Sequence, residues 1–225
     1  MATLLLTGAA GNLGSVVTQF FLDKGWDVHA ACINSTEASK LPIHPNCSHS
    51  IGNLSDEKDV EELFLEAGEV TAVVHLVGGI KAGEPIATTS LDTFENMILL
   101  NTRTTFLVVR QAMKVLQSNG GSIVTIGAKA ALHPETNKSA YAAAKAAAIN
   151  LTLTAAEEGK QYGIRANCIV PGIILTTANL EWASNGEEKN WTPPHDIAEA
   201  VFALCSESGK GISGAILPMY GKLPS

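Results

Sequence analysis

The sequence predicts an α/β protein built on one doubly wound parallel sheet with helices on both faces. Short apolar runs alternate with longer helical patterns along nearly all of the 225 residues. A glycine-rich turn directly follows the first apolar run, and no linker, repeat or low-complexity segment divides the chain. Continuous apolar strands separated by helices are typical of a parallel sheet buried on both sides, which binds ligands at the carboxyl ends of its strands.

The individual elements follow from the same patterns. Six apolar runs are expected to be strands: 3–7, 28–33, 70–77, 122–126, 165–170 and 215–219. Helical periodicity is expected near 13–24, 55–67, 91–118, 138–161 and 193–206. The stretch 172–192 has no clear period, and we expect it to be a mobile lid over the substrate. Residues 1–225 are therefore expected to form one domain.

Composition restricts the possible partners. Apolar residues make up 46% of the chain and charged residues only 16%, which suggests a doubly covered sheet and additional surface hidden in an oligomer. A net charge of -7 without a basic run argues against nucleic acid or an anionic membrane. No secretory signal or bilayer-spanning run is evident, so a cytoplasmic protein is expected. The scattered cysteines agree with a reducing compartment, and the histidines show no metal-ligand spacing.

The glycine-rich turn predicts a dinucleotide site of the Rossmann type. It reads Thr7-Gly8-Ala9-Ala10-Gly11-Asn12-Leu13-Gly14, and Asn12 or Leu13 is expected to begin the first helix. Glycines at these positions permit a tight turn, close approach of the backbone to a pyrophosphate, and close packing of helix on strand. The free N–H groups and positive dipole of the helix N-terminus then face the phosphates. The alternative is a strand-to-helix turn that needs glycine only for its geometry.

The identity of the dinucleotide is less determined. An acid at the end of the second strand would bind a ribose 2′-OH, but that position reads Cys32-Ile33-Asn34. Asn34 could hydrogen-bond either form, and Lys40 is a distant cation, so NAD and NADP both remain open and the missing acid favours NADPH. Asn53-Leu54, following a third strand, is expected beside the adenine; the alternative is a helix N-cap region around Ser55.

Tyr141 and Lys145 provide candidate chemistry. Because they are four residues apart, they share one face of the helix expected at 138–161. A phenol ordinarily titrates near pH 10, and a neighbouring ammonium is expected to lower the pKa of Tyr141 toward the working range. A tyrosine of that kind can serve as a general acid or base. Such pairs occur by chance on many helices, but together with the glycine turn this one predicts a redox enzyme.

With these landmarks in order, the whole chain resembles the short-chain dehydrogenase/reductase family. The landmarks are the Thr7–Gly14 turn, Gly78-Gly79, Asn101, Tyr141 with Lys145, and Pro171-Gly172 with Thr176. The resemblance implies that Tyr141 donates a proton to the substrate and that Lys145 binds the nicotinamide ribose. It also implies that Asn101 holds a water leading to Lys145, and that Pro171, Gly172, Ile173 and Thr176 position the carboxamide. A buried Asn101 could instead be a satisfied structural amide.

The chain departs from that family at informative places. The family's serine, thirteen residues before the tyrosine, is replaced by Ala128, and its Asn-Asn-Ala-Gly reads Leu76-Val77-Gly78-Gly79. Val77-Gly78-Gly79, the 127–132 stretch and Trp191-Thr192-Pro193 resemble the dihydropteridine reductase subgroup, which also works without the serine. The expected function is NAD(P)H-dependent reduction of a small carbonyl or quinonoid dihydropterin-like substrate. Ser139, Thr136 or a water could replace the serine. The alternative function is a weakly active or inactive dinucleotide-binding sensor.

The alanine-rich run 140–148 predicts an oligomer. Small side chains let another helix approach closely, so this helix and the one expected at 91–118 should pack against their counterparts in a two-fold dimer. A homodimer or a homotetramer is therefore expected. The alternative is tight packing of the alanines onto their own sheet.

Overall fold

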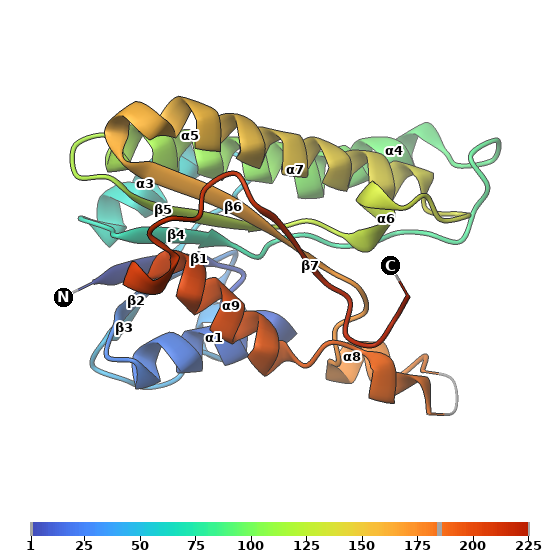
Figure 1. Ribbon diagram of the computed structural model, residues 1–225, viewed down its shortest axis with the longest axis horizontal. Coiled ribbons are helices and arrows are strands. Elements are labelled where there is room, and N and C mark those ends of the chain that lie inside the picture. Colours follow the sequence, from blue (N-terminus) through green and yellow to red (C-terminus); the bar gives the residue numbers. More distant parts are fainter. Residues whose placement is uncertain (1, 184–185, 225) are drawn as a thin grey trace.

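The computed structural model describes residues 2–183 and 186–224, and within them one sheet of seven parallel strands runs in the order β3-β2-β1-β4-β5-β6-β7 (Figure 1). This arrangement confirms the predicted fold class. The strands are β1 (Thr3–Thr7), β2 (Asp27–Cys32), β3 (Cys47–Ile51), β4 (Ala72–His75), β5 (Gly121–Ile126), β6 (Ile164–Pro171) and β7 (Ile216–Met219).

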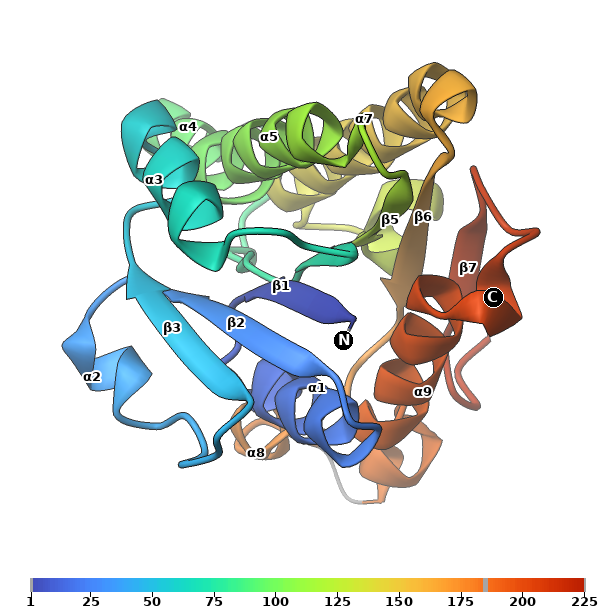
Figure 2. The same cartoon turned by 90° about the vertical axis from the view of Figure 1, so that its left-hand side faces the viewer.

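Helices cover both faces of the sheet (Figures 1 and 2). One layer holds α1 (Asn12–Asp23) and α9 (Pro194–Cys205), and the other holds α3 (Glu57–Ala67), α5 (Thr104–Leu116) and α7 (Ser139–Gly159). The remaining helices are short: α2 (Ser35–Ala38), α4 (Leu91–Met97), α6 (Lys129–Leu132), α8 (Thr177–Leu180), and the 3-10 turns Lys160–Tyr162, Glu187–Asn190 and Glu207–Gly209.

Alternate side chains of the central strands enter two separate cores. In β1, Leu4 and Leu6 pack in the core that α1 and α9 cover, whereas Leu5 packs in the core that α3 and α5 cover. Successive side chains of a strand point to opposite faces of the sheet, and here both faces are buried. That is why the central strands read as continuous apolar runs rather than as alternating patterns.

The parallel register brings the carboxyl ends of the strands to one edge. Thr7, the last residue of β1, pairs with Ala31 of β2 on one side and with His75 of β4 on the other. The turns that leave β1, β2 and β4 therefore begin at the same level. This is the edge at which a doubly wound sheet binds its ligands.

Two elements differ from the sequence-based prediction. A third strand is expected before Asn53-Leu54, but no apolar run gives its bounds, because β3 is a sheet-edge strand with the polar sequence Cys-Ser-His-Ser-Ile, in which only Ser50 is buried. The predicted helix 91–118 consists of α4, a π-helical turn at Ile98–Arg103 and then α5. Within the part of the chain that is described, no helix is long and apolar enough to cross a bilayer.

The described part of the segment 172–192 contains regular structure. It contains α8, and an isolated bridge joins Ile174 to Thr192. Residues 184 and 185 of this predicted lid lie outside the described residues. The mobility of the segment therefore stays a prediction.

Candidate active site

The turn after β1 depends on glycine because there is no space for a larger residue. A Cβ atom on Gly14 would lie 1.9 Å from the carbonyl oxygen of Gly8, and Gly8 itself has a φ of +70°. Helix α1 begins at Asn12, one of the two predicted starts, with Gly11 as its N-cap, and among the described residues no side chain caps its first N–H groups. A helix start of this kind offers backbone donors and a positive dipole to an anion.

A cavity of about 460 Å³ opens beside this turn. Five of the predicted cofactor residues line it: Gly8, Gly11, Asn53, Leu54 and Gly78. The rest of its wall is mostly apolar and comes from residues that were not predicted to bind the cofactor: Ala31, Cys32, Ile33, Glu37, Gly52, Ser55, Leu76, Val77, Leu99, Leu100 and Thr104. A dinucleotide fits such a site, because free N–H groups suit its phosphates and the apolar walls suit a flat base.

The end of β2 continues into a capping box. Asn34 caps α2 by accepting a hydrogen bond from the backbone N–H of Glu37 at 2.9 Å. Glu37 reaches back, and its Oε2 accepts a hydrogen bond from the N–H of Ile33 at 3.1 Å. The arrangement resembles the Ser/Thr-x-x-Glu box that starts many helices, except that the carboxylate accepts from the N–H of Ile33 rather than from that of the N-cap residue Asn34. It places a carboxylate in the wall of the cavity where the sequence showed no acid on the strand itself.

Two of the predicted cofactor residues, Thr7 and Asn53, use their side chains for hydrogen bonds within the protein. The hydroxyl of Thr7 lies 2.8 Å from Nδ1 of His75 and accepts a hydrogen bond from the N–H of Leu76. Asn53 folds its side chain onto Ser55, whose N–H and hydroxyl both donate to its Oδ1. The N-cap of α3 is Asp56, so Asn53 shapes the loop before the cap while still lining the cavity.

Asn101, Lys145 and the loop after β4 meet at Gly78. A Cβ atom on Gly78 would lie 2.7 Å from Oδ1 of Asn101 and 2.8 Å from Nζ of Lys145. Asn101 sits in the π-helical turn, fully buried, and exchanges two hydrogen bonds with the backbone of Gly79. Its amide is therefore satisfied by the protein, which agrees with the structural alternative for that side chain. The water relay through Asn101 stays a prediction.

Burial dominates the electrostatics of the predicted catalytic pair. Lys145 is 5% exposed, and its ammonium donates a hydrogen bond to the carbonyl of Ile126 at 2.8 Å. Desolvation lowers the pKa of Lys145 to about 8. Burial, and secondarily the carboxylate of Glu135, raises the pKa of Tyr141 to about 12. The expected lowering of the tyrosine pKa is thus not found, because burial outweighs any favourable charge on the phenolate.

The replaced serine leaves an apolar wall. Ala128 is buried at the N-cap position of α6 and offers no hydroxyl. Of the possible replacements, Thr136 is exposed, and Ser139 lines a different, small cavity together with Thr93 and Asn137. Neither is placed at the position of the missing hydroxyl by any contact in the structure.

The residues after β6 lie next to the start of α1. Pro171 ends β6, and the N–H of Gly172 donates to the carbonyl of Met219. Ile173 is half-buried, and the hydroxyl of Thr176 caps α8. The hydroxyl of Thr177 reaches Oδ1 of Asn12 at 3.4 Å. The segment predicted to hold the nicotinamide therefore contacts the start of α1, which also contains Leu13.

Comparison with known proteins identifies the family. A family model described as enoyl-(acyl carrier protein) reductase matches residues 8–221. The chain belongs to the short-chain dehydrogenase/reductase family. This membership confirms the expected enzyme class, an NAD(P)-dependent dehydrogenase/reductase. In the structure of ElxO with NADP bound, the same fold recurs with a TM-score of 0.91 at 24% identity, covering 98% of this chain and 97% of that one.

Relatives in this family differ in what their names describe. The 7alpha-hydroxysteroid dehydrogenase of Bacteroides fragilis is 27% identical, covering 98% of this chain and 93% of its own length. The uncharacterized oxidoreductase YuxG of Bacillus subtilis is 28% identical over 98% of this chain, which spans only 37% of that relative. Such varied names support the family and leave the substrate open. They add nothing specific to the resemblance to dihydropteridine reductase.

His75 is a site residue that the sequence analysis missed. Its buried ring lies between the hydroxyls of Thr7 and Thr104, at 2.8 and 3.3 Å, and so links β1, β4 and α5 directly beneath the cavity. Burial lowers its pKa to about 3. The sequence signal that could have identified His75 is its position as a polar residue at the end of an otherwise apolar strand.

Proposed function

We propose that this short-chain dehydrogenase/reductase uses NAD(P)H to reduce a small, flat, electron-poor substrate, with Tyr141 as the proton donor. The observation that carries the proposal is the pairing of a protonated phenol with a buried ammonium one helical turn away. With a pKa of about 12, Tyr141 keeps its proton at neutral pH. A protonated donor is the form that a reduction requires.

The protein's own residues have separate tasks in this mechanism. A bound nicotinamide supplies the hydride, and the chain supplies orientation and the proton. The backbone donors at the start of α1 hold the pyrophosphate, and Gly78 leaves room for Lys145 beside the cavity. Lys145 binds the ribose hydroxyls and favours proton release from Tyr141. Asn101 fixes the Gly78-Gly79 loop, because it bonds that loop in both directions.

Ala128 supports a substrate that accepts hydride without a second hydroxyl donor. Removing one such donor from an active site typically lowers the rate about a hundred- to a thousand-fold. An enzyme that keeps Tyr141 and Lys145 but lacks the donor is suited to a substrate already activated, and a quinonoid dihydropterin-like ring is our first choice. An ordinary small carbonyl compound is the second.

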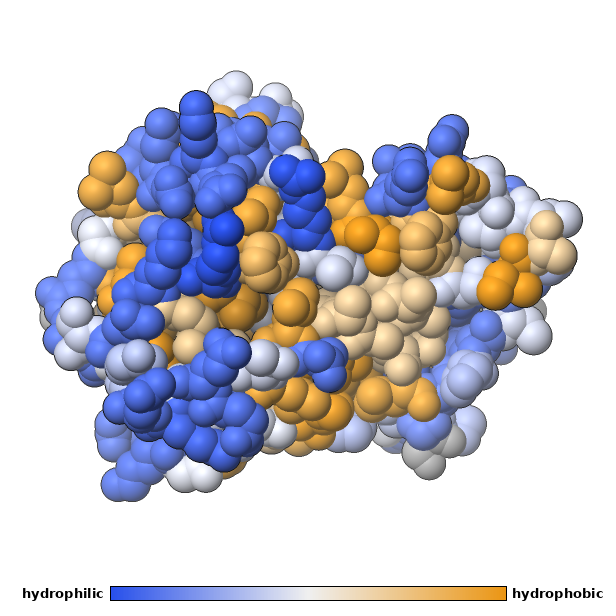
Figure 3. Space-filling view, turned by 90° about the horizontal axis from the view of Figure 1, so that it is seen from above, coloured by the Kyte–Doolittle hydropathy of each residue, from blue (hydrophilic) through white to orange (hydrophobic). Residues whose placement is uncertain are grey.

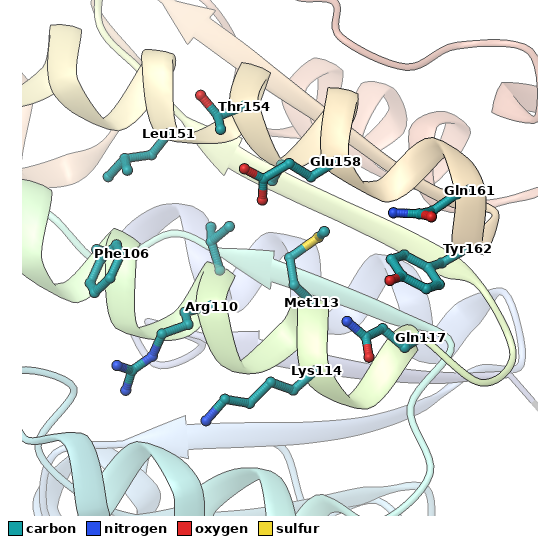
Figure 4. A pocket seen from close by; sticks show the side chains of 12 residues that line it. Phe106, Arg110, Met113, Lys114, Gln117, Leu151, Thr154, Glu158, Gln161 and Tyr162 are labelled. Atoms are coloured by element: carbon teal, nitrogen blue, oxygen red, sulfur yellow. The ribbon is translucent and has the colours of Figure 1, made fainter.

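The test follows oxidation of NADH and NADPH, in parallel, with a quinonoid dihydropterin and with a panel of ketones that includes steroid and 3-ketoacyl thioester substrates. Rapid oxidation with the pterin is expected, and Tyr141→Phe should lower it by about a hundredfold or more. Tyr162→Phe is the matched control, because this tyrosine is exposed on the outer helical layer (Figure 4).

Each other outcome points elsewhere. Turnover of a ketone alone would reject the pterin and keep the reductase. Full turnover by Tyr141→Phe would reject the mechanism. Tight cofactor binding without turnover of any substrate would favour the alternative, a dinucleotide-binding sensor. The missing hydroxyl at Ala128 supports that alternative.

We also propose that the outer face of α5 and α7 pairs with a second copy of the chain in a two-fold homodimer. Figure 3 looks onto this helical layer and shows an apolar area between hydrophilic flanks. Phe106 of α5 is 45% exposed, and Phe94 of the preceding helix α4 is 43% exposed. Between α5 and α7 lies a groove of about 520 Å³, across which Phe106 faces Leu151 and Met113 faces Glu158 (Figure 4).

Sedimentation velocity at micromolar concentration tests the dimer. The unmodified chain should sediment as a dimer or tetramer, and Phe106→Asp should shift it toward monomer, because a carboxylate would be buried in an apolar contact. Ile43→Asp is the control, since Ile43 is fully exposed in the loop after α2. A monomeric profile of the unmodified chain would refute the proposal.

A further inference from the structure

One charged side chain stands in the wall of the proposed cofactor cavity. Among the described residues that line it, Glu37 is the single acid, and none is a lysine or arginine. The rest of the wall is glycine, aliphatic or uncharged polar. Any ligand in this cavity therefore meets one negative group and no compensating side-chain cation.

The carboxylate of Glu37 is held in a defined place. Its Oε2 accepts the N–H of Ile33, and its own backbone N–H donates to Asn34. These two bonds direct the half-buried side chain back to the end of β2 rather than outward along α2. The carboxylate also acts on the neighbouring thiol of Cys32, whose pKa is raised to about 11 mainly by burial and additionally by the charge of Glu37.

The end of β2 is expected to lie beside the adenosine ribose, which is the part of the dinucleotide that differs between NAD and NADP. In a doubly wound fold, the group at the end of the second strand meets the adenosine ribose. A carboxylate accepts a hydrogen bond from a ribose 2′-hydroxyl, and it repels a 2′-phosphate. The backbone N–H of Ile33, which could otherwise bind that phosphate, already donates to Glu37.

We infer that Glu37 is the specificity-determining residue for the cofactor and that it makes this chain select NADH over NADPH. The inference rests on the proposed function, and it replaces the sequence-based preference for NADPH. That preference considered only the strand end at Cys32, whereas the acid comes from the helix that follows. Lys40, the cation that could have bound a 2′-phosphate, does not line the cavity.

Equilibrium binding measures the inference without any substrate. Nicotinamide fluorescence titrations should give a Kd for NADH at least tenfold below that for NADPH. Glu37→Gln keeps an acceptor and removes the charge, so it should reduce that ratio at least tenfold, mainly by tightening NADPH. Glu62→Gln, on the exposed side of α3, is the matched control and should leave the ratio unchanged.

A second measurement isolates the 2′-phosphate and needs no variant. Competition by 5′-AMP and by adenosine 2′,5′-bisphosphate should show weaker binding of the bisphosphate, and added salt should narrow the difference because it screens the repulsion. This arm keeps the inference testable if Glu37→Gln fails to fold.

The outcomes separate this inference from the proposed function. Equal Kd values for the two cofactors, tighter NADPH, or an unchanged ratio in Glu37→Gln would overturn the role of Glu37 and leave the reductase intact. Failure of both cofactors to bind the unmodified chain would overturn the proposed function itself.

Discussion

The two halves of the cleft are built by different means. The half at β1 to β3 is a cavity shaped by backbone, with glycines at the turn and unpaired N–H groups at the start of α1. The half at β4 to β6 is closely packed, and its polar side chains are buried and bonded to backbone groups. The second half contains a buried lysine and a tyrosine with shifted pKa values.

This difference separates binding from reactivity. Backbone donors hold an anion whatever the pH, and they require only that the chain approach closely. Desolvated side chains supply groups whose protonation can be tuned, and they require burial. Cofactor binding by the first half should therefore be lost when an added side chain fills its space. The reactivity of the second half should be lost when the charge or protonation of its side chains changes.

The largest effect is expected from Gly14→Ala. The added Cβ would meet backbone atoms of Gly8 and Ala9, which cannot move aside as a side chain can. We expect the unfolding free energy to fall by roughly 3 kcal/mol or more, measured by urea denaturation. Gly211→Ala is the control, because its Cβ would meet nothing within 4 Å. A Gly14→Ala protein of normal stability would disprove the close packing of this turn.

A smaller effect is expected in the reacting half from Gly78→Ala. Here the new Cβ would meet the ends of two side chains, Asn101 and Lys145, which can shift. Overpacking of this kind costs about 1–3 kcal/mol, but displacement of Lys145 should lower turnover more than it lowers cofactor affinity. Parallel kcat and Kd measurements check this. Equal losses in both would mean that the two halves are not separate.

The pH profile should also distinguish the halves. Because the pKa of Lys145 is about 8, its ammonium is lost above that pH, and turnover should fall about tenfold per pH unit. Cofactor affinity should fall less than turnover, because the backbone groups proposed to hold the pyrophosphate do not titrate and Lys145 is expected to contact only the nicotinamide ribose. Lys145→Arg should remove the decline up to about pH 10, even if its absolute rate is low. An unchanged decline in that variant would assign the titration to another group.

The smallest effect concerns His75, beneath both halves. Its pKa is about 3 in the folded protein and near 6.5 when unfolded, so below pH 6.5 only the unfolded chain takes up the proton. The unfolding free energy should then drop by up to about 1.4 kcal/mol per pH unit as pH falls from 6.5. His75→Asn should reduce that slope between pH 6.5 and 5.5, measured by denaturation. His49→Asn, on exposed β3, should keep it.

The sequence predicts the central part of this fold because its signals are local. Apolar runs mark β1, β2 and β4 to β6 since both faces of those strands are buried, and the partly exposed β7 is marked by its apolar sequence alone. The bounds of strand β3 could not be predicted, because an edge strand with exposed serine and histidine side chains has no apolar run. The π-helical turn at Ile98–Arg103 escaped because its residues have ordinary helical periodicity.

The site was predictable where a motif requires a particular backbone and less so where tertiary contacts decide. Gly8, Gly11 and Gly14 follow from the turn. The pKa of Tyr141 does not, because a helical spacing of four residues says nothing about how deeply the phenol is buried. Glu37 could have been found, since Asn34-Ser35-Thr36-Glu37 has the spacing of a capping box. His75 needed the register that aligns it with Thr7.

The two outermost strands of the sheet also bear on how copies of the chain can meet. An open edge offers unpaired backbone groups to any neighbouring strand, and natural proteins blunt such edges with short or polar strands and with proline. Here β3 is short and polar, and β7 has only four residues, of which Pro218 has no N–H to donate. Growth of the sheet from one molecule into the next is disfavoured at both ends. The helical layer proposed above for the dimer has no such open edge, so contacts made there can close on themselves instead of propagating into aggregates.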